Sequence, residues 1–567
     1  MNRYKYIKLM TLLLVTGSVI NMGCTKLDQK LGSTLTLNEA ANSFNASLFL
    51  QSAYNDVGGP YSNLGGDVSP LEDVPSDEAA VPTRKTDWFD NGEWVGLHQH
   101  NWPVDDGDGV FLSAWNDLNK INFDATNVLT FNPTKEQAAE ARFLRALSLY
   151  QVLELFGQFP FRQPGENLLN APKVYRGDSA VQFIISELTT ILPDLDPSNP
   201  ATKANPDAAK MLLMKLYLNR GALINRAAPT FDDADMQQVI TLGNAIINSG
   251  KYSYNPNYFS NFDWKNNNSP EAIFVRPNTA GVTSGYTGIQ NKWWPTLHYN
   301  SYTPLNPQAG WNGFATMASF YNSFAVNDAA ITQSVKDTLL KDTRIGGRFY
   351  AGCTDKSGIR PGFLIGQQYN ETPRVAGRTP SQYTYDTVEL LDRKGNKLAY
   401  LPQMNADLNE QDPATLEITG IRVIKYPPDY TLGTTSYNTA GNWLQLFRYP
   451  DVVLMVAEAK MRAAAADNDG ALAMVNDLRK ARGANPLTAP MALANSSNVY
   501  DPTTLLAERG RELYWECVRR TDLIRFGVYL NAWEYKPADA GTTYMVFPIP
   551  SSALAANPNL IQNPGYN

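Results

Sequence analysis

Residues 135–160 read KEQAAEARFLRALSLYQVLELFGQFP, and the architecture of the chain can be argued outward from them. Apolar side chains recur there at helical spacing on two faces, one with Phe143, Ala146, Tyr150 and Leu153 and the other with Leu144, Leu147 and Leu155. A helix that is apolar on two faces must pack between neighbours. Asn132-Pro133-Thr134 predicts its start, and Phe156-Gly157-Gln158-Phe159-Pro160 predicts its end.

Similar helical periodicity recurs in both halves of the chain. The further segments expected to be helical are about 206–226, 234–248, 443–466, 470–481 and 503–526. Because these segments come in pairs with short links, they predict stacked antiparallel hairpins of the tetratricopeptide kind, although the strict repeat signature is not visible. We therefore expect a mostly α fold built of tetratricopeptide-like helix pairs.

A second kind of sequence separates the helical parts. Residues 251–440 are rich in Gly, Pro, Asn, Tyr and Trp and contain almost no helical stripes. This composition predicts a large loop-rich insertion with short strands. Since no linker divides the chain, residues 37–567 are predicted to form a single domain whose helical body comprises about 37–250 and 441–567.

The N-terminus has the features of an export signal. Arg3, Lys5 and Lys8 precede an apolar run over residues 9–20, and a small residue precedes Cys24. The run is too short for a membrane-spanning helix of about 20 residues. We expect residues 1–23 to be a lipoprotein signal peptide, Cys24 to be lipidated, and residues 24–36 to be a flexible tether. Asn21 replaces the usual apolar residue, so simple secretion is the alternative.

Composition narrows the functional classes. The formal net charge is −7, which argues against nucleic acid as a partner because such binding needs clustered Lys and Arg. If Cys24 carries lipid, Cys353 and Cys517 remain, too few for a disulfide framework. We expect both to be free, with Cys517 a small buried side chain on the helix over 503–526.

That helix also carries many charges. Glu516 and Arg520 are four residues apart and Arg519 and Asp522 are three apart, so both pairs can form along one helix. A helix of this kind is usually structural, with ion pairs that fix its register.

The C-terminal third contains the most distinctive motifs of the chain. They are RYPDVVLMVAEA at 448–459, ERGREL at 508–513, DLIRFG at 522–527, FPIP at 547–550 and NPNLIQNPGY at 557–566. Together with AEARFLRA at 139–146, these motifs resemble the SusD/RagB family of Bacteroidota outer-membrane lipoproteins, over nearly the whole mature chain. An acidic residue often found after the Ile-Pro of the tail is replaced by Ser551.

The resemblance implies a function and a partner. It implies a cell-surface, lipid-anchored protein of the outer membrane that captures oligosaccharide or polysaccharide and acts as the lid of a SusC-like TonB-dependent transporter. The family fold, an α-superhelix with four tetratricopeptide-like helix pairs, agrees with the pattern above, and the resemblance implies that the loop-rich part over 251–440 binds the ligand. Some family members are linked to peptide uptake, so a peptide-binding, RagB-like lid is an alternative.

Tryptophans supply the physical argument for a sugar ligand. Of the 11, Trp88, Trp94 and Trp102 lie in one loop-like stretch, and Trp293, Trp294 and Trp311 lie in another. A flat indole can cover the C–H face of a sugar while polar side chains bind the hydroxyls. Several of these rings could instead anchor the loops from within.

The predicted ligand-binding residues are Trp88, Trp94, Trp293 and Trp294, with Arg348 and Tyr350 as polar partners.

Other constellations are weaker. His98 and His100 with the distant His298 make a poor zinc site, and no metal or cofactor is predicted. The acidic run over 105–109 resembles part of a calcium loop but is better explained as a turn that caps a helix from about residue 111. An enzyme is not predicted, since no nucleophile elbow or zinc-protease motif is present, and a secreted glycoside hydrolase is the remaining alternative.

Overall fold

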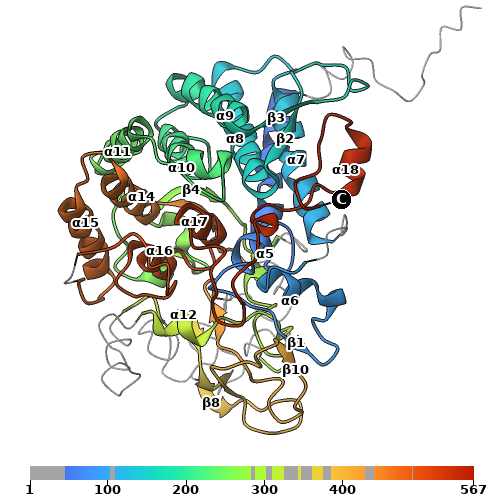
Figure 1. The fold of residues 1–567 in the computed structure, drawn as a ribbon, viewed down its shortest axis with the longest axis vertical. Coiled ribbons are helices and arrows are strands. Elements are labelled where there is room, and N and C mark those ends of the chain that lie inside the picture. The colour runs from blue at the N-terminus through green and yellow to red at the C-terminus, as the bar shows by residue number, and fades with distance from the viewer. Residues whose placement is uncertain are drawn as a thin grey trace, which may run out of the picture. The chain divides into compact units, whose positions relative to one another are not determined.

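Helices dominate the computed structural model, which describes residues 45–102, 109–282, 288–301, 310–324, 342–346, 361–373, 385–427, 440–487 and 490–566 (Figure 1). Their bounds are α3 Ala46–Asp56, α4 Gly58–Ser62, α5 Val68–Asp73, α6 Glu93–His98, α7 Val110–Val128, α8 Lys135–Phe156, α9 Gly177–Ile191, α10 Pro206–Ile224, α11 Asp233–Ile247, α12 Ala318–Asn322, α14 Tyr449–Arg462, α15 Asn468–Ala481, α16 Leu505–Leu513, α17 Arg519–Arg525 and α18 Ser551–Ala556. The predicted mostly α class is confirmed.

The central helix α8 forms where the sequence predicts it. Thr134 accepts from the Gln137 backbone N–H at 3.2 Å, and Gln137 returns a side-chain bond to Thr134, which makes a capping box. Gly157, at φ 71°, ends the helix in the left-handed conformation that favours glycine. The sequence signals at both ends of α8 are therefore confirmed.

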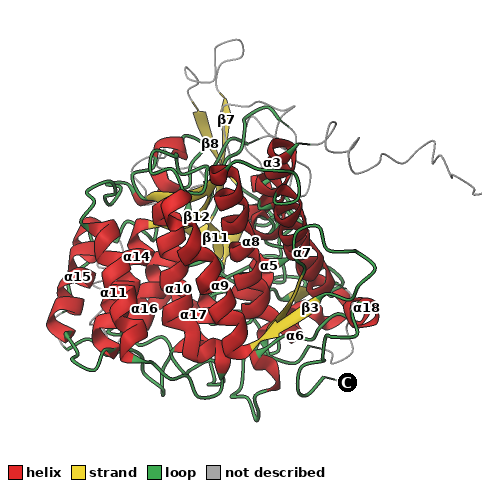
Figure 2. Cartoon of the chain, turned by 90° about the horizontal axis from the view of Figure 1, so that it is seen from above, coloured by secondary structure: helices red, strands yellow, loops and turns green. Residues whose placement is uncertain are grey.

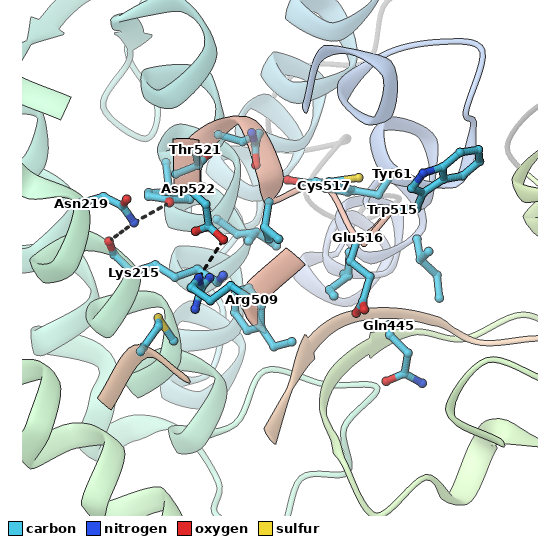
Figure 3. A pocket seen from close by; sticks show the side chains of 18 of the residues that line it. Tyr61, Lys215, Asn219, Gln445, Arg509, Trp515, Glu516, Cys517, Thr521 and Asp522 are labelled. Atoms are coloured by element: carbon cyan, nitrogen blue, oxygen red, sulfur yellow. Dashed lines mark hydrogen bonds and ion pairs between the residues drawn. The ribbon is translucent and has the colours of Figure 1, made fainter. Parts of the chain in front are cut away.

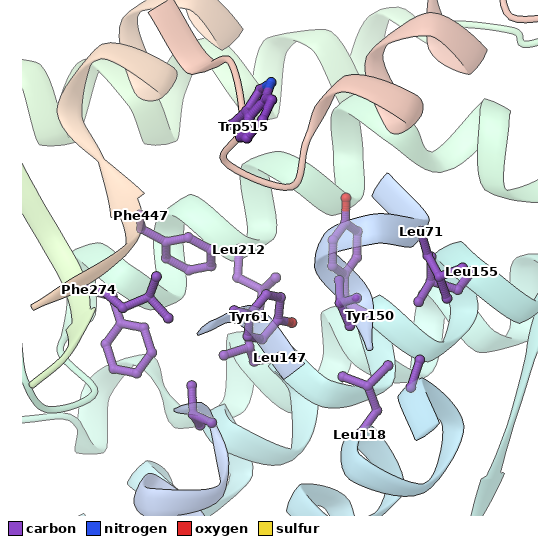
Figure 4. Packing of buried hydrophobic residues seen from close by; sticks show 14 of the residues in the cluster. Tyr61, Leu71, Leu118, Leu147, Tyr150, Leu155, Leu212, Phe274, Phe447 and Trp515 are labelled. Atoms are coloured by element: carbon purple, nitrogen blue, oxygen red, sulfur yellow. The ribbon is translucent and has the colours of Figure 1, made fainter. Parts of the chain in front are cut away.

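Both apolar faces of α8 are buried. Leu147, Tyr150 and Leu155 of this helix lie in one cluster with Leu118 of α7 and Leu212 of α10 (Figure 4). Along the chain, α7 packs on α8, α8 on α9, α9 on α10, α10 on α11, α11 on α14, and α14 on α15 (Figure 2). Successive neighbours thus stack as the helix-pair prediction requires.

The strands are short and occur in pairs. They are β1 Thr83–Arg84, β2 Gln158–Phe161, β3 Lys173–Arg176, β4 Ala272–Arg276, β5 Gly362–Leu364, β6 Gly366–Gln367, β7 Tyr369–Pro373, β8 Tyr385–Glu389, β9 Ala399–Tyr400, β10 Asn409–Glu410, β11 Arg422–Ile424 and β12 Leu444–Arg448. β1 pairs in parallel with β10, whereas β2–β3, β4–β12, β5–β11, β6–β9 and β7–β8 are antiparallel. The predicted insertion of loops and short strands is confirmed.

The segment expected to be helical from about 443 begins instead as a strand. Residues 444–448 form β12, which pairs with β4 and runs directly into α14 at Tyr449. Leu444 and Phe447 are buried in the pairing, so the first apolar residues of this run form a strand and the helix begins after them. β4 and β12 attach the two ends of the loop-rich part to the helical body.

The segment over 503–526 is not one helix but two. α16 ends at Leu513 and α17 starts at Arg519, and the break between them holds Trp515 at φ 57° and Cys517 at φ 59°. Buried carboxylates stabilise the break, because Glu78 accepts from the Trp515 N–H at 2.9 Å and Asp73 accepts from the Cys517 N–H at 3.2 Å. Tertiary contacts therefore override a strong helical pattern.

Cys517 consequently lies in a loop and not on a helix. It is free and half-buried, with its sulfur 3.3 Å from the Ser69 hydroxyl. Burial raises the pKa of this thiol to about 12, so it is unreactive at neutral pH.

Glu516, Arg519 and Arg520 pair with distant residues and not with the local partners that the sequence suggests. Pairs three residues apart do form elsewhere in the segment, between Glu508 and Arg511 and between Asp522 and Arg525. Arg520 binds Glu154 of α8 at 2.5 Å, and Arg519 binds Asp77 at 2.6 Å. Glu516 binds Arg448 at 2.6 Å. The ion pairs therefore connect separate elements and do not merely support one helix.

A larger set of such charges lies between α16 and its neighbours. We call it the glutamate–arginine network; its members are Glu271, Arg344, Arg448, Arg482, Glu508, Glu512 and Glu516. Glu512 is fully buried and accepts from both Arg448 and Arg482. Burial alone would raise the pKa of Glu512, but these guanidinium groups lower it to about 2.

Residues 46–567 cluster into one compact unit. No helix within the described part of the chain combines the length and apolar character needed to cross a membrane. Cys24, the tether over 24–36, Arg348, Tyr350, Cys353 and most of the acidic run over 105–109 lie outside the described residues.

Candidate ligand-binding site

The two tryptophan-bearing stretches, more than two hundred positions apart, meet in the folded chain. The indole N–H of Trp88 donates to the Trp311 carbonyl at 2.7 Å, and the Trp311 N–H donates to the Trp294 carbonyl at 2.8 Å. The Trp88 ring lies against Gly313 so closely that a β-carbon there would collide with it. Glycine is therefore required at 313 for this contact.

Three of the rings are half-buried, which is the exposure expected of a stacking surface. These are Trp88, Trp294 and Trp311. The rings of Trp294 and Trp311 lie 5.7 Å apart between centroids, at 41° to each other. A ring anchored on one side and open on the other can cover an apolar sugar face with little loss of side-chain entropy.

Trp94 and Trp293, predicted as ligand contacts, are instead core residues. They are 5% and 3% exposed. Trp94 packs edge-on against Trp88 and Phe314, with centroids 5.6 and 5.5 Å away, and donates to the Asp90 carboxylate at 2.6 Å. For these two rings the alternative of loop anchors describes the structure, and Trp94 packs against the half-buried Trp88.

A polar rim adjoins the rings. The Tyr299 hydroxyl donates to Asp87, one residue before Trp88. The Arg393 guanidinium lies 3.8 Å above the Tyr299 ring centre, and its Nη2 is 3.8 Å from the Asp87 carboxylate. We call Trp88, Trp294 and Trp311, with Asp87, Tyr299 and Arg393, the tryptophan site.

Behind Arg393 lies a buried carboxylate. Glu417 accepts from the Arg393 Nε at 2.7 Å and from the His298 Nε2 at 2.9 Å. Burial alone would raise the pKa of Glu417, but bonds from His298 and Arg393 lower it to about 2. The His298 pKa is lowered by burial, and its Nδ1 accepts from the Asn300 N–H, as a neutral imidazole does. The fixed charge on Glu417 thus holds Arg393 over Tyr299.

Two buried arginines hold the loops that carry the site. Arg84 donates to the carbonyl oxygens of Asn312, Leu416 and Thr419. Arg422 donates to the Thr419 carbonyl at 2.7 Å and to the Asn312 side chain at 2.8 Å. Burial, followed by the charge of Arg422, lowers the pKa of Arg84. Backbone dipoles of the bound loops stabilise these cations, so each loop is fixed relative to the others.

The loop that presents Trp88 is strained. Trp88, Asp90, Asn91 and Gly92 have φ values of 61°, 35°, 53° and 84°. Non-glycine residues in this region cost about 1–3 kcal/mol each and persist where surrounding contacts determine the conformation. The reciprocal backbone hydrogen bonds between Arg84 and Asp87, at 2.9 and 3.1 Å, help to hold the loop in this conformation. Such strain is typical of functional loops.

Sequence analysis found part of this site. Trp88 and Trp294 were predicted, and Tyr299 and Trp311 lie in the stretch that was singled out. Arg393 and Glu417 were not predicted, because they lie in turns of an unpatterned segment and no spacing rule connects them to the tryptophans.

The three histidines do not form a metal site. His98 bonds the carbonyls of Ala79 and Glu534, His100 bonds Asp539 at 2.7 Å, and His298 bonds Glu417. Within the described ranges no group of His, Cys, Asp or Glu is arranged to hold an ion.

Helix α7 starts at Val110 as predicted, and the Glu93 side chain accepts from its first N–H at 3.3 Å.

A cavity lies where residues of the helical body meet Lys292 and Tyr426 of the loop-rich part (Figure 3). Tyr61, Lys215, Gln445, Arg509 and Trp515 are among its lining residues, and its volume is about 60 Å³. Ligand pockets usually measure about 300–1,000 Å³, so this cavity is too small for a sugar ring and has room for a few water molecules.

Comparison with known proteins gives consistent matches. Residues 270–566 match the model of the SusD family. The starch-binding protein SusD of Bacteroides thetaiotaomicron is 26% identical over 525 residues, which cover 87% of this chain and 84% of that protein.

Solved structures share the fold. The surface glycan-binding protein A of Bacteroides thetaiotaomicron, in complex with laminarihexaose, superposes with a TM-score of 0.62 at 17% identity, covering 91% of this chain and 98% of that chain. A SusD superfamily protein from Parabacteroides distasonis superposes with a TM-score of 0.64 at 18% identity, covering 94% and 100%.

Proposed function

Since the chain belongs to the SusD family, we propose that it is a glycan-binding protein of the cell surface that takes up oligosaccharides or polysaccharide at the tryptophan site. The proposal includes lipidation at Cys24 and attachment to the outer membrane by that lipid. It also includes a SusC-like TonB-dependent transporter as the partner, with this chain as the lid. The relative named a starch-binding protein supports the ligand class.

One observation carries the ligand proposal: three half-buried tryptophan rings from distant parts of the chain converge beside a polar rim. Sugars are bound by such a combination because each ring face is apolar and each edge carries hydroxyls. Asp87 offers carboxylate acceptors and Arg393 offers donors, so both kinds of hydroxyl contact are supplied.

The charges of the site favour a neutral glycan. Arg393 is the cation of the tryptophan site. Asp87 and Glu417 both lie within 4 Å of it, so the positive charge of Arg393 is already compensated. A uronic acid would meet Asp87, and none of the six residues of the tryptophan site supplies an unpaired cation to offset the repulsion. We therefore propose neutral oligosaccharides over polyuronates.

The same geometry argues for binding without hydrolysis. A glycoside hydrolase needs one carboxyl that stays protonated and gives its proton to the leaving group. Glu417, with a pKa of about 2, is ionised at neutral pH and engaged by His298 and Arg393. It therefore cannot act as that acid, and the proposed role is that of a receptor.

Affinity is expected to be modest. Stacking on two or three rings contributes about 1 kcal/mol each, against the cost of ordering a flexible chain, which predicts a Kd in the micromolar to millimolar range.

Calorimetric titration of the protein lacking residues 1–24 against neutral and acidic polysaccharides tests the proposal. The same mixtures are assayed for new reducing ends. Binding of a neutral glycan without new ends is the expected result, and new ends would contradict the receptor role. If no glycan binds but peptides do, the result would instead support the peptide-binding alternative.

A further inference from the structure

We propose that Phe89 is a further stacking platform next to the tryptophan site, and that it binds the neighbouring sugar unit of a chain whose first unit lies on the tryptophans. This inference rests on the proposed function and extends it, because it makes the site respond to ligand length.

The Phe89 side chain is exposed to solvent, although an aromatic ring is stabilised by burial. Its exposure is 55%, although Trp88 before it is half-buried and Trp94 after it is buried. Burial of a phenyl ring from water is strongly favourable, so a ring left in solvent is stabilised when a ligand covers it.

The backbone holds Phe89 in place without straining it. Its φ and ψ are −72° and −50°, an ordinary helical conformation, whereas Trp88 before it and Asp90 after it have positive φ. The Phe89 carbonyl accepts from the Gly92 N–H at 2.6 Å. The loop therefore exposes Phe89 together with Asp90 and Asn91, and Phe89 is the aromatic residue among these three.

Contacts on both sides make the turn rigid. On one side the Trp88 indole is bonded to the Trp311 carbonyl, and the Tyr299 hydroxyl is bonded to Asp87. On the other side Asp90 accepts from the buried Trp94 at 2.6 Å. An exposed ring on a fixed loop binds at a lower entropic cost than one on a mobile loop.

The neighbours of Phe89 suit a sugar. Asp90 and Asn91, the two residues after Phe89, are exposed, so a carboxylate and a carboxamide follow the phenyl ring in the chain. Consecutive Cα atoms are about 3.8 Å apart, so Phe89 starts within one residue of Trp88 and can reach the adjacent unit of the same glycan. The ligand class is a linear neutral oligosaccharide longer than the part that covers the tryptophans.

The test compares the wild-type protein with Phe89→Ala over oligosaccharides from disaccharide to heptasaccharide. The series are neutral α-glucans, β-glucans, mannans and galactans, and each series that the wild-type protein binds is followed by calorimetry. Phe123→Ala, at a 48% exposed position on α7, is the matched control, and Phe89→Tyr is the conservative variant.

The expected result is a loss of about 3- to 10-fold in affinity for the longer members with Phe89→Ala, with short members unchanged. Phe123→Ala should match the wild type at every length, and Phe89→Tyr should keep the preference for longer chains.

Two outcomes would overturn the inference. Equal affinity of Phe89→Ala and wild type at all lengths would show that no sugar covers Phe89. A uniform loss at all lengths would show that the substitution acts through the loop. Failure of the wild-type protein to bind any series contradicts the proposed function itself, and that result is distinct because it does not depend on the variant.

Discussion

Buried arginines organise both the helical body and the loops of the tryptophan site, but they are neutralised in different ways. In the glutamate–arginine network, Arg448 meets the carboxylates of Glu512 and Glu516, and despite burial these raise its pKa. Beneath the site, Arg84 meets carbonyl oxygens, and burial lowers its pKa. Carboxylates join α16 to β12, to the residue after α15 and to Arg344 of the loop-rich part, whereas carbonyl acceptors fix the paths of loops.

The comparison teaches where rigidity serves function. The body fixes α14, α15 and α16 through paired charges that do not face a ligand. The loops need fixed backbones because their half-buried rings are open to solvent on one side. The two regions should therefore respond differently to acid, to substitution and to ligand.

Acidification should have the largest effect, through the body. The pKa values of Glu458 and Glu512 are about 2, below the value of about 4.3 expected in the unfolded chain. A carboxylate with a depressed folded pKa stabilises the fold above the unfolded pKa, and this is lost as pH falls from about 4.3 towards 2. Each contributes on the order of 2–3 kcal/mol. Urea denaturation at a series of pH values should show this fall, and a flat profile would contradict it.

Glu512→Gln should have the next largest effect. It leaves Arg448 and Arg482 with less negative charge in a buried setting, which should destabilise the protein by about 3–5 kcal/mol. Lys460→Ala, which removes the partly exposed pair with Asp467, is the control and should cost less than about 1 kcal/mol. Equal losses in thermal denaturation would mean that the network is no more important than a surface pair.

Arg84→Met should have a smaller effect on stability but a specific effect on binding. It leaves the carbonyls of Asn312 and Thr419 without their cation, at a cost of about 2–3 kcal/mol. Because those loops carry Trp311, glycan affinity should also fall. Chemical denaturation and calorimetry together measure both. Normal affinity in a folded Arg84→Met protein would refute the scaffold role.

Trp311→Ala should lower affinity with the least change in stability. Loss of one stacking ring corresponds to about 1 kcal/mol, or roughly a fivefold higher Kd. Trp443→Ala is the matched control, since Trp443 is also half-buried but bonds Asn266 and Asn278 in another part of the chain. Similar losses of affinity in both variants would place the ligand elsewhere or indicate a general effect.

The sequence predicted features with local causes. Helix α8 has its cap at Thr134 and its stop at Gly157, and both are encoded by neighbours in the chain. The break after α16 has no Gly or Pro at its centre, because it depends on Asp73 and Glu78 from the other end of the chain. Periodicity therefore predicted one helix where tertiary contacts make two.

The same limit applies to the site. The positions of the tryptophans predicted two candidate stretches, but the exposure of each ring depends on what the fold packs against it. Trp88 and Trp294 are open to solvent, whereas Trp94 and Trp293 are not. Arg393 is held at the site by Glu417, Tyr299 and Asp87, contacts that follow from the fold and not from spacing.

The most direct test of the central claim is a crystal structure of the protein lacking residues 1–24 with a neutral oligosaccharide that it binds. The account predicts sugar rings on Trp88, Trp294 or Trp311, with hydroxyls bonded to Asp87 or Arg393. Sugar bound elsewhere, with these three indoles uncovered, would contradict it.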